Sequence, residues 1–262
     1  SSKKNTTLTE FKRFENIKKS LQELPKDTVF VIATPPTLHF RQAKAILKYG
    51  RDVIIEKPIF ISATEVQEIL SLVNSSKNIV LEGFMHRYTK LYIEFMKFWN
   101  KEKNNIVALK SSFCIPEIPK KTFRNKKDIA SSCLYDMGCY GLSLLNDMEL
   151  DLKEIKIKSF EKINSRIINI LLTGIVNNIS VDIKFGENKD YENYVEIITK
   201  KNKTIKFFPF FYGRKALKSI EYCTDDDIRL EQFNDYNAFQ SMFNDNRENL
   251  ILNQKVRINK SL

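Results

Sequence analysis

The sequence predicts an α/β fold in which a doubly wound parallel sheet is followed by an α+β unit with a large, mostly antiparallel open sheet. Short, continuous apolar runs such as Val29–Thr34, bounded by turn residues, are typical of parallel strands that are buried on both faces. Beyond Met148 the hydrophobic period changes to two, as half-buried antiparallel strands require. We therefore expect two structural units, residues 1–86 and residues 87–262.

The stretch Val29–Pro58 contains one βαβ unit. Its first strand leads through a Pro-Pro turn into a helix from about His39 to Tyr49, Gly50 ends this helix, and a second strand stops at Glu56-Lys57-Pro58. A right-handed crossover places the ends of both strands at one edge of the sheet. Because ligands bind at this carboxyl edge in open α/β sheets, we expect a ligand beside Thr34–Pro36 and Glu56–Pro58.

The remaining elements follow from the same patterns. Short amphipathic pieces are expected at Leu8–Phe14 and Ile17–Leu24, and the basic run Lys120–Lys127 is predicted to be a loop. Further helices are expected at Glu65–Val73 with Ser62 or Thr64 as its cap, Tyr88–Lys101, Ser131–Met148 and Tyr236–Leu252. Further strands are expected at Ile79–Phe84, Ile106–Ile115, Lys153–Phe160, Arg166–Thr173, Asn178–Phe185, Tyr194–Thr199, Thr204–Phe208 and Ile228–Phe233, with short antiparallel connections.

The composition argues against several classes of function. The net charge is +11, but the lysines are interspersed with Glu, Asp and Asn, so we expect no nucleic-acid partner; steeply salt-dependent binding would indicate the contrary. No run of eighteen apolar residues exists and the opening SSKKNTTLTE is no targeting signal, so we expect a cytoplasmic protein with no membrane partner. The four cysteines are scattered and His39 and His86 are the only histidines, so we expect neither a metal site nor disulfides.

Four segments occur in a characteristic order and spacing: ATPPTLH from Ala33, EKP from Glu56, GFMHRY from Gly83 and YDMGCY from Tyr135. Together they resemble the glucose-fructose oxidoreductase / inositol dehydrogenase (Gfo/Idh/MocA) family of NAD(P)-dependent oxidoreductases, over roughly residues 1 to 150. The resemblance implies a Rossmann-like sheet, a nicotinamide cofactor and a sugar, sugar nucleotide or cyclic polyol as substrate. It also implies a homodimer or higher homo-oligomer, because the open sheet face commonly mediates dimerisation in the family.

The resemblance assigns catalytic roles to Lys57, Asp136 and Tyr140. Lys57 follows a buried strand, where its amine can hydrogen-bond a substrate oxygen and partial burial can lower its pKa. Asp136 and Tyr140 are four positions apart and share one helix face. Tyr140 corresponds to the family's proton-transfer residue, with Lys57 favouring its phenolate, and Asp136 would orient the substrate. The alternative for this pair is a capping aspartate and a packed tyrosine.

Cofactor and substrate contacts are also implied by the resemblance. Ala33, Thr34, Pro35 and His39 match the segment that lines the nicotinamide ribose, and Glu56 and Lys57 match the positions beside it. Arg87 could meet an anionic group of the substrate, or could form a surface or interdomain salt bridge. Tyr140 is the other expected substrate contact.

Two departures from the family pattern leave a second interpretation open. No G-x-G-x-x-G turn precedes Val29, so the parallel sheet is expected to be incomplete at the N-terminus, by about one βαβ half-unit. Ser2 and Lys3 would then lie where the adenosine ribose is read, which favours NADP over NAD unless they are a frayed terminus. The run Ala130–Cys133 replaces a glycine-rich run. The alternative function is a catalytically idle, dimeric binding or scaffold protein.

Overall fold

The structure is a computed structural model, and it describes residues 12–76, 78–116, 129–164, 166–187, 189–212, 216–225 and 227–244. Several predicted features lie outside these residues: Ser2 and Lys3, most of the piece Leu8–Phe14, the run Lys120–Lys127 and the second half of the helix expected at Tyr236–Leu252. Within the described ranges, no helix combines the length and the apolar character needed to cross a bilayer.

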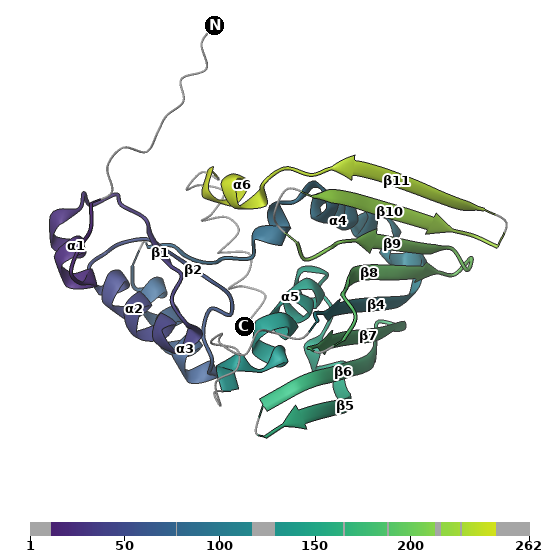
Figure 1. The fold of residues 1–262 in the computed structure, drawn as a ribbon, viewed down its shortest axis with the longest axis horizontal. Coiled ribbons are helices and arrows are strands. Elements are labelled where there is room, and N and C mark those ends of the chain that lie inside the picture. Colours follow the sequence, from purple (N-terminus) through teal and green to yellow (C-terminus); the bar gives the residue numbers. More distant parts are fainter. Residues whose placement is uncertain are drawn as a thin grey trace, which may run out of the picture.

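A three-stranded parallel sheet forms the first unit (Figure 1). Its strands are β1 (Phe30–Ile32), β2 (Val53–Ile55) and β3 (Val80–Glu82), in the order β1-β2-β3. Helices α1 (Ile17–Glu23), α2 (Pro36–Lys48) and α3 (Ala63–Asn74) share one hydrophobic core with this sheet. The other face packs against Met242 of α6 (Ala238–Asn244), which returns from the far end of the chain. The predicted doubly wound parallel sheet is confirmed.

The starts of α2 and α3 have local causes. Helix α2 begins at Pro36, three residues earlier than expected, because the ring of proline fixes a helical φ and its missing N–H is not needed in the first turn. His39 therefore lies inside α2 and is fully buried. At α3, the side chain of Ser62 accepts a hydrogen bond from the backbone N–H of Glu65 at 3.2 Å, so Ser62 is the cap.

The joint between the two sheets is a short turn, η1 (Met85–Tyr88), followed by α4 (Lys90–Glu102). The single helix expected at Tyr88–Lys101 is interrupted at Thr89, which is extended with φ −80° and ψ 148°. The Thr89 hydroxyl accepts from the backbone N–H of Tyr92 at 3.1 Å and so begins α4. Two residues separate the turn η1 from the end of β3, so it lies beyond the carboxyl end of this strand.

The second unit is built on an eight-stranded sheet in the order β11-β10-β9-β8-β4-β7-β6-β5 (Figure 1). Neighbouring strands are antiparallel except β4 and β7, which are parallel. Helices α4 and α5 (Cys139–Asp147) pack into the same core as this sheet. The strands are β4 (Ile106–Cys114), β5 (Lys156–Ile163), β6 (Arg166–Val176), β7 (Ile179–Gly186), β8 (Glu192–Thr199), β9 (Thr204–Phe208), β10 (Leu217–Cys223) and β11 (Ile228–Asn234). A large, mostly antiparallel sheet was expected, and the structure confirms it.

Strand β10 is absent from the elements that the sequence predicts. Its inward positions are Lys218, Ile220 and Tyr222, so a lysine stands where the alternating pattern requires an apolar residue. The Lys218 ammonium is fully buried and donates to the carbonyls of Pro209 at 2.8 Å and Tyr212 at 2.5 Å. Burial lowers the pKa of Lys218 to about 8, although Asp235 acts in the opposite direction.

The lowered pKa of Lys218 should make the free energy of unfolding depend on pH. A lysine in the unfolded chain titrates near about pH 10.4, so between about pH 8 and pH 10.4 the unfolded chain binds a proton that the folded chain does not. The stability contributed by Lys218 therefore rises with pH in this window, by up to about 3 kcal/mol. The measurement is the free energy of unfolding in urea at pH 7 and at pH 10. Lys218→Met should remove the increase between the two pH values, whereas Lys97→Met, at an exposed position of α4, should keep it. Equal pH dependence in wild type and Lys218→Met would contradict the assignment.

Candidate active site

A cavity of about 290 Å³ lies at the carboxyl ends of β1 and β2. This is the edge at which the sequence predicts a ligand, and the cavity brings together residues from the loop after β1, the loop after β2 and the segment before α5. Its lining residues are Ala33, Thr34, Pro35, Pro36, Glu56, Lys57, Pro58, Ala130 and Asp136. Six of the residues singled out from the sequence therefore share one cavity, although they come from three separate parts of the chain.

A buried ion pair forms one wall of the cavity. The Lys57 ammonium donates to Asp136 Oδ1 at 2.8 Å and to the Asp136 backbone carbonyl at 2.6 Å. The two side chains are only 14% and 7% exposed. Lys57 follows β2, and Asp136 lies in the π-helical turn η5 (Leu134–Gly138) that leads into α5. The pair therefore joins the parallel sheet to the helix of the second unit.

The charge of Lys57 is retained despite its burial. Burial alone would lower the pKa of its amine, but the charge of Asp136 and the hydrogen bond to it hold that pKa above the ordinary value. The sequence-based expectation of a lowered pKa is therefore wrong, because it considered burial without the paired carboxylate. At neutral pH Lys57 is an ammonium ion whose charge is balanced by Asp136.

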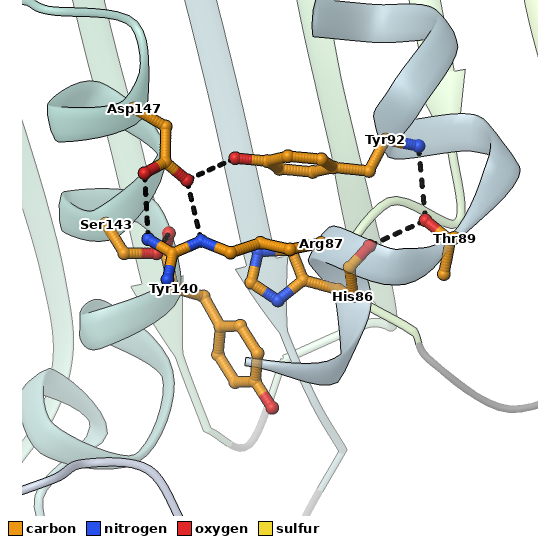
Figure 2. Close-up of polar contacts among 7 residues, drawn as sticks. All are labelled: His86, Arg87, Thr89, Tyr92, Tyr140, Ser143 and Asp147. Carbon is orange, nitrogen blue, oxygen red and sulfur yellow. Dashed lines mark hydrogen bonds and ion pairs between the residues drawn. The ribbon is translucent and has the colours of Figure 1, made fainter. Parts of the chain in front are cut away.

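Tyr140 lies beside this pair but is not among the residues that line the cavity. The residue is 3% exposed, and its ring packs against His86 with ring centroids 5.0 Å apart. Its hydroxyl donates to Met85 Sδ at 3.7 Å, while Lys57 Nζ lies 4.9 Å from the centre of its ring. In Figure 2 this hydroxyl points away from the side chains drawn around it. The structure thus places the ring of Tyr140, rather than its hydroxyl, against Lys57.

The protonation state of Tyr140 follows from the same packing. Burial raises the pKa of the phenol, and the opposing effect of Lys57 is too small to compensate. Tyr140 is therefore a neutral phenol at neutral pH, and the sequence-based expectation that Lys57 favours a phenolate is wrong. Aromatic packing sets this result, since Phe84, Phe113 and Phe211 complete the shell around the ring.

His39 occupies a different place from the one expected. It is fully buried, and its two ring nitrogens lie 3.0 Å from the carbonyl oxygen of Pro58 and 2.8 Å from that of Thr34. With both nitrogens facing backbone oxygens, the imidazole offers no polar atom to a cofactor. His39 instead joins the two loops that line the cavity, so its role at this site is to hold Thr34 and Pro58 in register.

Arg87 also departs from expectation, since its guanidinium is occupied within the protein (Figure 2). Its Nε and Nη2 atoms donate to the two carboxylate oxygens of Asp147, at 2.7 Å and 2.9 Å. The hydroxyl of Tyr92 donates to the same carboxylate. Burial alone would lower the pKa of Arg87, but Asp147 holds it above the ordinary value. The salt-bridge alternative therefore describes Arg87, and the proposed contact with a substrate anion does not.

Sequence reasoning missed the partner of Arg87, which is Asp147. Pro36 and Pro58 line the cavity within the two segments beside which the sequence predicts a ligand, and Ala130 belongs to the run that departs from the family pattern. Asp147 lies eleven positions after Asp136, about three turns of an α-helix, but this spacing does not identify Arg87 as its partner. In the part of the chain that the structure describes, His, Cys, Asp and Glu side chains form no group of three that could hold a metal ion.

Comparisons with known proteins agree with the fold of the first unit. A family model named GFO_IDH_MocA, an oxidoreductase family with an NAD-binding Rossmann fold, matches residues 2–84. Trans-1,2-dihydrobenzene-1,2-diol dehydrogenase of Xenopus tropicalis is 27% identical over 126 residues, which cover 46% of this chain and 38% of that protein. D-xylose 1-dehydrogenase (NADP(+)) 2 of Haloferax volcanii is 29% identical over 45% of this chain and 36% of its own length. The chain thus spans about two fifths of the curated relatives it matches.

Solved structures extend the similarity of fold to the second unit. KijD10, a 3-ketoreductase from Actinomadura kijaniata in complex with NADP and TDP-benzene, superposes with a TM-score of 0.73 at 18% identity, over 86% of this chain and 70% of that chain. Aldose-aldose oxidoreductase from Caulobacter crescentus, complexed with glycerol, gives a TM-score of 0.71 at 14% identity, over 85% and 68%. At these identities the likeness concerns the fold.

Removing the carboxylate of the central pair should destabilise the protein. Asp136→Asn leaves the buried Lys57 ammonium without a charged partner, so we expect the free energy of unfolding to fall by about 3–5 kcal/mol in urea unfolding at pH 7. The control is Glu94→Gln, which breaks the exposed pair Lys97–Glu94 and should change stability by less than about 1 kcal/mol. Equal effects of the two substitutions would show that the Lys57–Asp136 pair contributes no more than a surface pair.

Proposed function

We propose that this chain, which matches the Gfo/Idh/MocA oxidoreductase family over residues 2–84, transfers a hydride between a nicotinamide cofactor and a sugar, sugar nucleotide or cyclic polyol. The observation that carries the proposal is the buried Lys57–Asp136 pair in the wall of a cavity at the carboxyl edge of the parallel sheet. A bound nicotinamide cofactor supplies or accepts the hydride, and the residues of this chain handle the proton. In this scheme residues 1–86 bind the cofactor and residues 87–262 bind the substrate.

Lys57 is the proposed proton donor. Reduction of a carbonyl group forms a C–H bond and an O–H bond, so the carbonyl oxygen must receive one proton. The Lys57 ammonium lines the cavity and stays protonated at neutral pH because its pKa lies above the ordinary value. Its charge stabilises the negative charge that develops on the oxygen, and its N–H bond breaks as the O–H bond forms.

Asp136 and Tyr140 support Lys57 from two sides. The carboxylate and the backbone carbonyl of Asp136 accept two of the ammonium N–H bonds, which leaves the third to point at a substrate oxygen. The ring face of Tyr140, 4.9 Å from Nζ, adds a cation–π contact. With its hydroxyl on Met85, Tyr140 acts in this geometry as a positioning residue and Asp136 as the residue that orients the proton donor.

The cavity fits the nicotinamide end of the cofactor. Its volume of about 290 Å³ lies at the lower limit of small-molecule pockets, so it suits a ring with its ribose rather than a whole dinucleotide. Ala33, Thr34 and Pro35 form one wall and Glu56 lies beside Lys57. The Thr34 hydroxyl donates to Gln42 Oε1 at 2.7 Å, which fixes this wall before a ligand binds. Thr34, Pro35, Ala33 and Glu56 are therefore the proposed cofactor contacts.

NADP is the favoured cofactor in this proposal. Lys3, next to Ser2, supplies a cation of the kind that accommodates the 2′-phosphate, although both lie outside the described residues. Two matched relatives are named as NADP-dependent, the D-xylose 1-dehydrogenase (NADP(+)) 2 and scyllo-inositol 2-dehydrogenase (NADP(+)) IolU.

We further propose that the protein works in the cytoplasm as a homodimer or higher homo-oligomer. The sheet face opposite α4 and α5 exposes Ile175 and Phe208, at 70% and 37%, and also carries ion pairs such as Lys110–Glu196. An open sheet face with scattered apolar residues is a suitable surface for a second copy. Sedimentation velocity that finds a monomer at all concentrations tested would exclude the oligomer.

Loss of the Lys57 amine should sharply reduce turnover by protein that is still folded. Because the substitution also leaves the buried Asp136 carboxylate without its cation, the folded state of the variant is checked by circular dichroism before kcat is measured. D-xylose and scyllo-inositol with NADP⁺, and the reverse reactions with NADPH, serve as probes, and kcat is measured on the probe that the wild type converts fastest. Lys57→Met should lower kcat by about 100- to 10,000-fold, the usual contribution of a positioned proton donor. Lys97→Met, the same change on the exposed face of α4, should leave kcat unchanged. A Lys57→Met protein that keeps a tenth or more of wild-type kcat would remove Lys57 from the mechanism.

A further inference from the structure

The helix that carries Asp136 and Tyr140 is held at both ends by buried ion pairs. Lys57 binds Asp136 at the start of the segment, and Arg87 binds Asp147, the last residue of α5. Both cations follow neighbouring strands of the parallel sheet, since Lys57 comes after β2 and Arg87 lies in η1 after β3. Two fixed points on adjacent strand ends thus set the position of one rigid helix.

The pair at the far end has the geometry of a permanent anchor. The Asp147 carboxylate receives both forked N–H bonds of Arg87 and the hydroxyl of Tyr92. The side chains of Arg87 and Asp147 are 9% and 14% exposed, and the Arg87 guanidinium lies over the ring of Phe84 at 4.6 Å. A guanidinium does not lose its proton at any physiological pH, so Arg87 keeps its positive charge in this contact. It faces no part of the 290 Å³ cavity, whose lining includes neither Arg87 nor Asp147.

The turn η1 connects this anchor with the site. His86 precedes Arg87, and its ring packs at 5.0 Å from Tyr140 and at 5.2 Å from Tyr92. Figure 2 shows His86 and Arg87 side by side, with Tyr140 on one side and Asp147 and Tyr92 on the other. Consecutive residues of η1 therefore contact α5 at Tyr140 and at Asp147, so a shift of α5 along its axis would disturb the packing of Tyr140 and the Lys57–Asp136 bond together.

We propose that Asp147 is a positioning residue, which through Arg87 and Tyr92 holds α5 where Asp136 meets Lys57. The effect of Asp147 on kcat rests on the proposed function, whereas the effect of Asp147 on the Lys57–Asp136 contact does not. A merely structural role would lower global stability and leave that contact unchanged in the folded protein.

The test is Asp147→Asn, read first without any substrate. The NMR signal of the Lys57 ammonium is assigned by its loss in Lys57→Met, and the exchange of its protons with water is measured in the folded protein. We expect this exchange to become about tenfold faster in Asp147→Asn, because the hydrogen bonds to Asp136 open more often. The matched control, Glu94→Gln, removes the carboxylate of the exposed pair Lys97–Glu94 on α4 and should leave the exchange unchanged.

Measurements of kcat and of the Kd for NADPH then distinguish a positioning role of Asp147 from a role in cofactor binding. In Asp147→Asn we expect kcat to fall about 100-fold, as for a misplacement of about 1 Å, and the Kd for NADPH to stay unchanged. Wild-type exchange at Lys57 in a folded Asp147→Asn protein would overturn the inference. If Asp147→Asn does not fold, Arg87→Lys is the second variant, because it keeps the positive charge and loses the paired N–H donors of the guanidinium. We expect Arg87→Lys to give an intermediate increase in the exchange of the Lys57 ammonium protons. No increase in Arg87→Lys would also overturn the inference. A wild type that binds no NADPH would refute the proposed function and leave the exchange test intact.

Discussion

The buried pair of Lys57 and Asp136 is the interaction on which the rest of the structure depends. It joins residues 79 positions apart, at the end of a buried parallel strand and at the start of a helix that packs on a different sheet. Removing either partner leaves a buried charge uncompensated, which costs about 3–5 kcal/mol. The two units must therefore keep one relative position, and that position places an ammonium ion at the carboxyl edge where an α/β sheet binds its ligands.

Other contacts of the site serve to keep this pair in place. His39 joins the loops after β1 and β2 by its two ring nitrogens, so the cavity walls are fixed before any ligand arrives. Packing around Tyr140 keeps its phenol neutral and its ring against the ammonium. Arg87 and Asp147 hold the other end of α5. A site built in this way is preorganised, because its charged groups need little movement to meet the transition state.

The parts of this arrangement that depend on local sequence could be predicted, and those that depend on packing could not. Apolar runs and turn residues locate the strand ends, and the EKP and YDMGCY segments identify Lys57 and Asp136 as candidate site residues. The burial of His39 and the engagement of Arg87 by Asp147 depend on which helix packs against which sheet, which a pattern of residue types does not specify. Strand β10 was not predicted for a related reason, since the ammonium of Lys218 donates its hydrogen bonds to carbonyls of the preceding loop, which the sequence pattern does not reveal.

The most direct test of the central claim is a titration of the protein with NADPH, followed by nicotinamide fluorescence, in the wild type and in Ala33→Trp. Ala33 is exposed and lines the cavity, so an indole at this position fills the space without disturbing a core. The account predicts saturable one-to-one binding with a Kd of about 1–100 μM in the wild type and at least tenfold weaker binding in Ala33→Trp. Absence of saturable binding in the wild type, or equal affinity in both proteins, would contradict the assignment of this cavity to the nicotinamide.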